Sequence, residues 1–87
     1  MAVDERLLKV YTTKRCGDCI VTKAVLDRLG IVYEEVDIDQ DPGAAATVLA
    51  INGGYRTVPT VVLPDGRVLV EPSRRTLLSA LGLPVEP

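Results

Sequence analysis

Residues 7–39, LLKVYTTKRCGDCIVTKAVLDRLGIVYEEVDID, contain two strand-like segments separated by a helical one. Side chains alternate in character over residues 7–12, which predicts a strand. After a short loop, apolar residues recur at helical spacing over residues 20–29, and Gly30 suits the left-handed position that ends a helix. Residues 31–39 are β-branched and alternate again, which predicts a second strand. Because a helix connects the two strands, we expect them to be parallel.

The rest of the chain predicts a helix, a hairpin and a last helix. Asp41 is a good N-cap and Pro42 suits the first helical position, so we expect a helix through Ile51. The other expected elements are strands at Thr60–Leu63 and Arg67–Val70, joined by a turn at Pro64-Asp65-Gly66, and a helix that Ser73 caps and that runs through Leu81. The order β-α-β-α-β-β-α predicts an α/β fold, a four-stranded mixed sheet flanked by three helices.

The composition is that of one small globular domain over residues 1–87, with 47% hydrophobic residues and a net charge of -2. No basic stripe is present, so we expect no nucleic-acid partner. The apolar runs are too short to span a bilayer, and residues 1–6 do not resemble a signal peptide. We therefore expect a cytoplasmic monomer, in a compartment that keeps thiols reduced.

Cys16 and Cys19 are the only cysteines, and the chain has no histidine. A disulfide between them closes too small a loop to staple a fold, and structural zinc needs four Cys or His ligands, so we expect no metal site within one chain. Reversible thiol–disulfide chemistry fits this inventory. The alternatives are two inert buried cysteines, an adaptor without chemistry, and a non-enzymatic carrier in which two chains each give Cys16 to an iron–sulfur cluster.

The position of the two cysteines assigns them different roles. The thiolate attacks disulfides, and the N-terminus of a helix stabilises an anion, so we expect Cys16 to be the nucleophile and the deeper Cys19 to be the resolving thiol. Lys14 and Arg15 add positive charge before Cys16, although plain solvated surface charge explains them equally well. Asp18 opposes them and predicts a more reducing couple.

From Leu8 to Leu81 the chain resembles the glutaredoxin family of the thioredoxin fold. The segments that carry this resemblance are Val10-Tyr11-Thr12-Thr13, Cys16-x-x-Cys19, Val36-Asp37-Ile38-Asp39 and Arg56-Thr57-Val58-Pro59. The resemblance implies a thiol–disulfide oxidoreductase in which Pro59 is cis and faces the cysteines. It also implies that Val58 offers backbone hydrogen bonds to an extended thiol substrate and that Arg56 contacts a substrate carboxylate. The expected substrate-binding residues are Lys14, Arg15, Arg56, Thr57, Val58, Pro59 and Ser73.

Other positions depart from the glutathione-using members, which have a basic residue at the place of Thr13 and a Gly-Gly pair and an Asp at the place of residues 70–73. Asn52-Gly53-Gly54 with Pro72-Ser73, and the Cys-Gly start of the active site, are similar to mycoredoxins, which use mycothiol. The implied reaction reduces mixed disulfides with a small thiol as co-substrate, mycothiol rather than glutathione, and with no bound cofactor.

The implied partners are the small thiol, disulfide-containing proteins and an NADPH-dependent disulfide reductase system. An alternative is a dithiol protein-disulfide reductase that thioredoxin reductase recharges, such as an electron donor to ribonucleotide reductase. The two hypotheses differ over Cys19, because the first reaction can run on Cys16 alone and the second needs both sulfurs.

Overall fold

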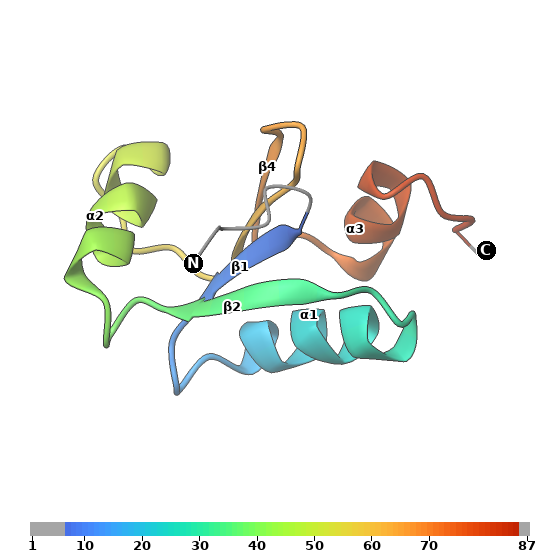
Figure 1. Cartoon of the computed structure of the whole chain (residues 1–87), viewed down its shortest axis with the longest axis horizontal. Coiled ribbons are helices and arrows are strands. Elements are labelled where there is room, and N and C mark those ends of the chain that lie inside the picture. Colours follow the sequence, from blue (N-terminus) through green and yellow to red (C-terminus); the bar gives the residue numbers. More distant parts are fainter. Residues whose placement is uncertain (1–6, 86–87) are drawn as a thin grey trace.

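The structure is a computed structural model that describes residues 7–85. Residues 1–6, on which the expectation about a signal peptide rests, lie outside the described residues. The elements follow the expected order: β1 (Leu8–Thr12), α1 (Gly17–Arg28), β2 (Tyr33–Asp37), α2 (Pro42–Ile51), β3 (Thr60–Val62), β4 (Val68–Val70) and α3 (Arg74–Ala80). Figure 1 shows the sheet at the centre of the molecule, with α2 and α3 at opposite ends and α1 alongside β2.

The four strands form one mixed sheet in the order β2-β1-β3-β4. β1 pairs in parallel with β2, with Thr12 opposite Asp37, and β3 pairs antiparallel with both β1 and β4. The expected parallel pair and hairpin are therefore confirmed. The expected strand at residues 31–39 was too long, because pairing with β1 covers only Tyr33–Asp37.

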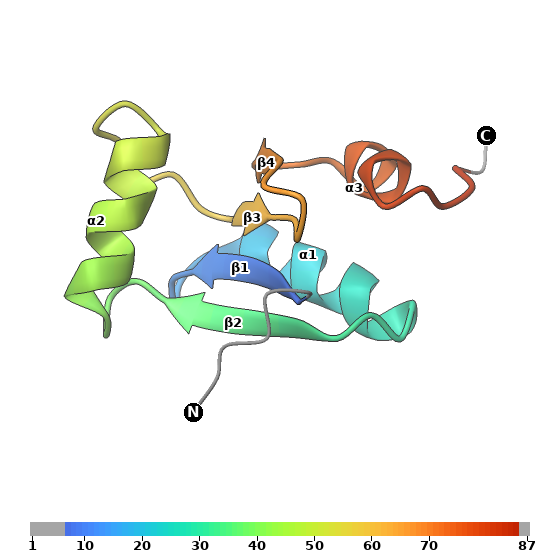
Figure 2. The same cartoon turned by 45° about the horizontal axis from the view of Figure 1, so that its top comes forward.

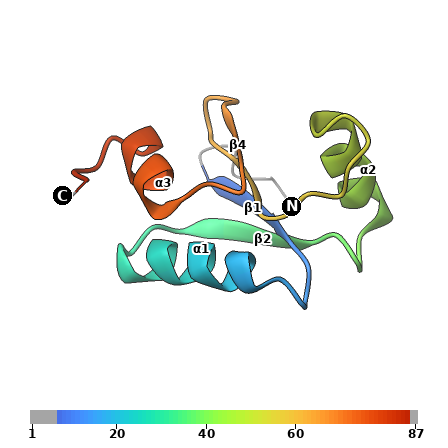
Figure 3. The same cartoon turned by 180° about the vertical axis from the view of Figure 1, so that it is seen from behind.

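Two hydrophobic clusters fill the two faces of the sheet. One contains Val10 of β1, Leu26 of α1 and Leu77 of α3, and the other contains Tyr11 of β1 and Val48 of α2. Neighbouring residues of a strand point to opposite faces, so this division places α1 and α3 on one face and α2 on the other. Figures 2 and 3 show the same arrangement from two further directions.

Side chains cap all three helices at their N-termini. Cys16 caps α1, Asp41 caps α2 ahead of Pro42, and Ser73 caps α3. Asp41 and Ser73 were expected in these roles. α1 begins at Gly17, which leaves the sulfur of Cys16 at the open end of the helix.

The apolar spacing in α1 located the helix but not its buried face. Ile20 and Val21 are 61% and 58% exposed, whereas Thr22 and Leu26 are buried together with Cys19. Gly30 ends the segment in the expected left-handed conformation, with φ of 69°. Over residues 7–85, no helix combines the length and apolar character needed to cross a membrane.

Candidate active site

Cys16 stands at the N-terminus of α1 with its side chain turned back over the first turn. Its Sγ accepts the backbone N–H of Cys19 at 3.0 Å, and the residue is half-buried. The first N–H groups of a helix have no partner within the helix, and they carry the positive end of its dipole. Cys16 therefore combines access from solvent with surroundings that stabilise a thiolate.

Cys19 lies one turn further along α1, and only 1% of its surface is exposed. Burial raises the pKa of its thiol from 9.0 to about 12, and the hydrogen bond with Cys16 adds to the rise. Both cysteines are free thiols in the structure. At neutral pH, Cys19 is thus a protonated, shielded thiol beside the more open Cys16.

The loop before β3 lies against Cys16. The Val58–Pro59 peptide bond is cis, as the family resemblance implied, and the Sγ of Cys16 donates to the carbonyl oxygen of Val58 at 3.7 Å. Pro59 is buried, and its own carbonyl accepts the backbone N–H of Glu71 at 2.8 Å. This bond brings the segment after β4 to the edge of the same site.

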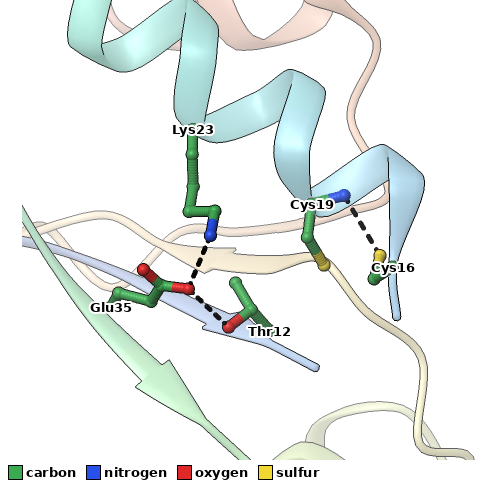
Figure 4. A network of polar contacts seen from close by, with 5 residues as sticks. All are labelled: Thr12, Cys16, Cys19, Lys23 and Glu35. Atoms are coloured by element: carbon green, nitrogen blue, oxygen red, sulfur yellow. Dashed lines mark hydrogen bonds and ion pairs between the residues drawn. The ribbon is translucent and has the colours of Figure 1, made fainter. Parts of the chain in front are cut away.

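Three polar side chains connect α1 to the sheet near the cysteines. The hydroxyl of Thr12 donates to Glu35 at 2.9 Å, and the ammonium of Lys23 donates to the same carboxylate oxygen at 2.8 Å. Figure 4 shows Cys19 pointing from α1 toward the end of β1 that carries Thr12. The Lys23 ammonium lowers the pKa of the Glu35 carboxyl, and the carboxylate raises the pKa of Lys23.

The structure shows the exposure of two further expected binding residues and the contacts of two others. Lys14 and Arg15 are exposed in the loop before Cys16. Arg56 forms an ion pair with Asp39 at 2.7 Å, so its guanidinium is engaged within the chain. The side chain of Ser73 accepts the backbone N–H of Thr76 at 3.1 Å. These contacts fix where the side chains lie, and their roles toward a substrate stay predictions.

Sequence reasoning missed two features of the site. The sequence did not indicate the contacts of Glu35, which is exposed but accepts hydrogen bonds from Lys23 of α1 and from the buried Thr12 of β1. No local pattern pairs these residues, because they meet only once α1 packs against the sheet. Glu71 has a φ of 47°, a conformation that residues other than glycine seldom adopt, and the sequence carried no sign of it.

Among the described residues, no three His, Cys, Asp or Glu side chains gather closely enough to hold a metal ion. The arrangement within one chain is suited to exchange between thiols and disulfides, with Cys16 reached first.

Comparison with known proteins agrees with this geometry. The glutaredoxin family model matches residues 8–69. A Mycobacterium tuberculosis protein assigned to the glutaredoxins is 48% identical over 66 residues, which cover 76% of this chain and 79% of the relative. Mycoredoxin 1 of Corynebacterium glutamicum is 38% identical over 63 residues, covering 72% and 77%. The glutaredoxin-like protein NrdH of Salmonella typhimurium is 34% identical over 58 residues, covering 67% and 69%.

A solved structure supports the same relationship. A variant of the thioredoxin-like protein BC3987 superposes with a TM-score of 0.79 at 30% identity, covering 88% of this chain and 96% of that one. The chain belongs to the glutaredoxin family, has its thioredoxin-like fold and is a thiol–disulfide oxidoreductase.

Proposed function

We propose that this protein reduces mixed disulfides between proteins and a small thiol, with mycothiol rather than glutathione as its co-substrate. Cys16 is the nucleophile, and the loop of Thr57, Val58 and Pro59 binds the substrate. The small thiol is consumed in the reaction, so the proposal needs no bound cofactor. An NADPH-dependent disulfide reductase of a reducing, cytoplasmic compartment regenerates the small thiol.

The reaction consists of two exchanges at the sulfur of Cys16. Its thiolate attacks the small-thiol sulfur of the mixed disulfide, a Cys16–small-thiol bond forms, and the protein thiolate leaves and takes up a proton. A second small-thiol anion then attacks the small-thiol sulfur of this adduct. The products are the disulfide of the small thiol and the Cys16 thiolate. The second small thiol is oxidised as the protein thiol is reduced, and one disulfide bond replaces another.

The observation that carries this proposal is the unequal access to the two sulfurs. Cys16 is half-buried at the open end of α1, whereas Cys19 is 1% exposed. A substrate sulfur therefore reaches Cys16 first, and both exchanges take place there without Cys19. The similarity to mycoredoxin 1, at 38% identity, supports the same reading.

The choice of mycothiol rests on the charged groups that adjoin the loop of Thr57, Val58 and Pro59. Arg56, which is expected to contact a substrate carboxylate, forms an ion pair with Asp39 at 2.7 Å within the chain. Glu71 brings a further carboxyl group to the segment whose backbone contacts Pro59. Glutathione carries two carboxylates, whereas the cysteine of mycothiol is joined to sugar-like groups through an amide. A thiol without carboxylates avoids repulsion from the carboxyl group of Glu71 and does not compete with Asp39 for Arg56.

A dithiol protein-disulfide reductase that thioredoxin reductase recharges is the second candidate. The similarity to the glutaredoxin-like protein NrdH, at 34% identity, favours it. The cysteines lie one helical turn apart, with the N–H of Cys19 on the sulfur of Cys16. In this reaction Cys19 attacks the Cys16–protein disulfide, and the oxidised pair is reduced by the reductase.

Replacement of Cys19 by serine separates the two candidates. NADPH-coupled reduction of a mixed disulfide is measured with mycothiol and its reductase, with glutathione and its reductase, and with thioredoxin reductase alone. We expect Cys19→Ser to keep most of the mycothiol-driven activity and Cys16→Ser to lose it. An inactive Cys19→Ser variant, with a parent that only thioredoxin reductase drives, contradicts the proposal and favours the dithiol reductase.

A further inference from the structure

Cys19 can compete with the second small thiol for the adduct on Cys16. Its sulfur attacks the Sγ of Cys16, a Cys16–Cys19 disulfide forms, and the small thiol leaves as a thiolate that takes up a proton. This closure oxidises Cys19, leaves Cys16 at the disulfide level and reduces the bound small thiol. It requires Cys19 to lose its own proton, although the residue is 1% exposed. Whatever stabilises the Cys19 thiolate therefore controls how often the adduct closes.

The helix places one cation on the same face as Cys19. Lys23 follows Cys19 by four residues in α1, a spacing that brings side chains within about 5–6 Å of each other. A free lysine side chain extends into solvent, but this one is tied to Glu35 of β2 at 2.8 Å. In Figure 4 the ammonium is turned toward the sheet, on the side of the helix from which Cys19 projects.

Thr12 completes the arrangement from a third element. It is 1% exposed, lies at the end of β1, and donates its hydroxyl to Glu35 at 2.9 Å. The carboxylate is thus held by a buried donor on one side and holds Lys23 on the other. The groups around Cys19 that carry or can carry charge are Cys16 and Lys23 on its own helix and Glu35 on β2, while Thr12 of β1 does not titrate.

The charge states of this pair decide what it can do. The pKa of Lys23 is raised by Glu35, and the pKa of Glu35 is lowered by Lys23, so both groups stay charged at neutral pH. A protonated ammonium cannot accept the Cys19 proton, and a carboxylate so stabilised is a poor base. The pair can act on Cys19 only through its field, where the ammonium favours the thiolate.

We propose that Lys23, fixed by Glu35 and Thr12, is the positioning residue that stabilises the Cys19 thiolate and so sets how often the Cys16 adduct closes to the Cys16–Cys19 disulfide. The inference rests on the proposed thiol–disulfide exchange at Cys16. Lys23 makes no contact with the substrate in this role, and it leaves the first attack by Cys16 unchanged.

Dithio-bis-nitrobenzoate reports the two attacks separately, because Cys16 releases one coloured thionitrobenzoate and closure by Cys19 releases the second. Lys23→Met and Lys23→Gln remove the ammonium, and Lys23→Arg retains a cation. Lys9→Met is the matched control, since Lys9 lies in β1 beside Tyr11, on the sheet face that α2 covers. Release is followed by stopped flow across a range of pH, and thermal unfolding verifies that each variant is folded.

We expect the first release to stay within about twofold of the parent, and the second to fall about threefold in Lys23→Met and Lys23→Gln. A threefold fall corresponds to a rise of about one unit in the pKa of Cys19 when the ammonium is lost. Such a rise lowers the thiolate fraction about tenfold, while the more basic thiolate is about threefold more reactive. The pH profile of the second release shifts upward, and Lys23→Arg and Lys9→Met behave as the parent.

Other outcomes overturn the inference. One is a second release in Lys23→Met and Lys23→Gln with the rate and pH profile of the parent. Another is an equal fall of the first and second releases in these variants. A third is a fall of the second release in Lys9→Met or Lys23→Arg as large as that in Lys23→Met. A parent protein with no first release contradicts the proposed function itself, so the two failures are distinguishable.

Discussion

Shielding of Cys19 predicts a large, measurable difference in its reactivity between the folded and the unfolded chain. The perturbation is Cys16→Ser, which leaves Cys19 as the one thiol of the chain. The variant is treated with iodoacetamide at about pH 8, below the ordinary pKa of cysteine, in buffer and in denaturant. In denaturant the thiol of Cys19 is exposed, and its alkylation rate there is the reference for the rate in the folded chain.

The magnitude follows from the pKa of Cys19. A rise from 9.0 to about 12 leaves about a thousandfold less thiolate at a pH below both values. A more basic thiolate is a better nucleophile, with a Brønsted coefficient of about 0.4–0.5, so the net slowing is about 30- to 60-fold. Serine at position 16 removes the part of the rise caused by Cys16, but burial is the larger cause, and we expect at least about tenfold slowing to remain.

Intact-mass measurement of the alkylated fraction over time gives both rates. The matched control is Cys19→Ser. In this folded variant we expect the more open Cys16 to be alkylated far faster than Cys19 is in folded Cys16→Ser. The reasoning is refuted if Cys19 in folded Cys16→Ser is alkylated within about twofold of its rate in denaturant.

Three further predictions concern the stability of the fold. Denaturant unfolding of Leu26→Ala shows a loss of about 2–5 kcal/mol because Leu26 is fully buried, whereas Leu29→Ala, at 42% exposed, loses less than about 1 kcal/mol; equal losses contradict the placement of the core. Ser73→Ala removes the cap of α3 and costs about 0.5–2 kcal/mol, and an unchanged unfolding midpoint argues against the cap. Burial raises the pKa of Cys19 from 9.0 and of Tyr33 from 10.0, each to about 12, so the folded chain favours their protonated forms. The urea midpoint of unfolding should therefore fall as the pH rises above 9. A midpoint that does not change with pH in this range contradicts the prediction.

Local patterns were enough to predict the order of elements. Asp41-Pro42 begins α2 and the turn around Gly66, with φ of 93°, joins β3 and β4, because capping and turn formation depend on adjacent residues. The placement of Cys16 at a helix start was predictable for the same reason. Boundaries were less accurate, since a strand ends where its partner ends.

Contacts between distant segments were not predictable. The ion pairs of Lys23 with Glu35 and of Arg56 with Asp39 depend on how α1 and the loop before β3 pack against the sheet. The charged residues in the sequence do not indicate which of them form a pair. The exposed apolar face of α1 was missed because spacing alone does not tell which side of a helix meets the sheet. Ile20 faces outward while Thr22 is buried.

The central claim is that Cys16 alone carries the small thiol during turnover. Its most direct test is the intact mass of Cys19→Ser after incubation with mycothiol disulfide, followed by addition of reduced mycothiol. The account predicts one mycothiol per chain, bound to Cys16, which the second addition releases at the rate of steady-state turnover. No adduct, or an adduct that reduced mycothiol does not release, contradicts the account.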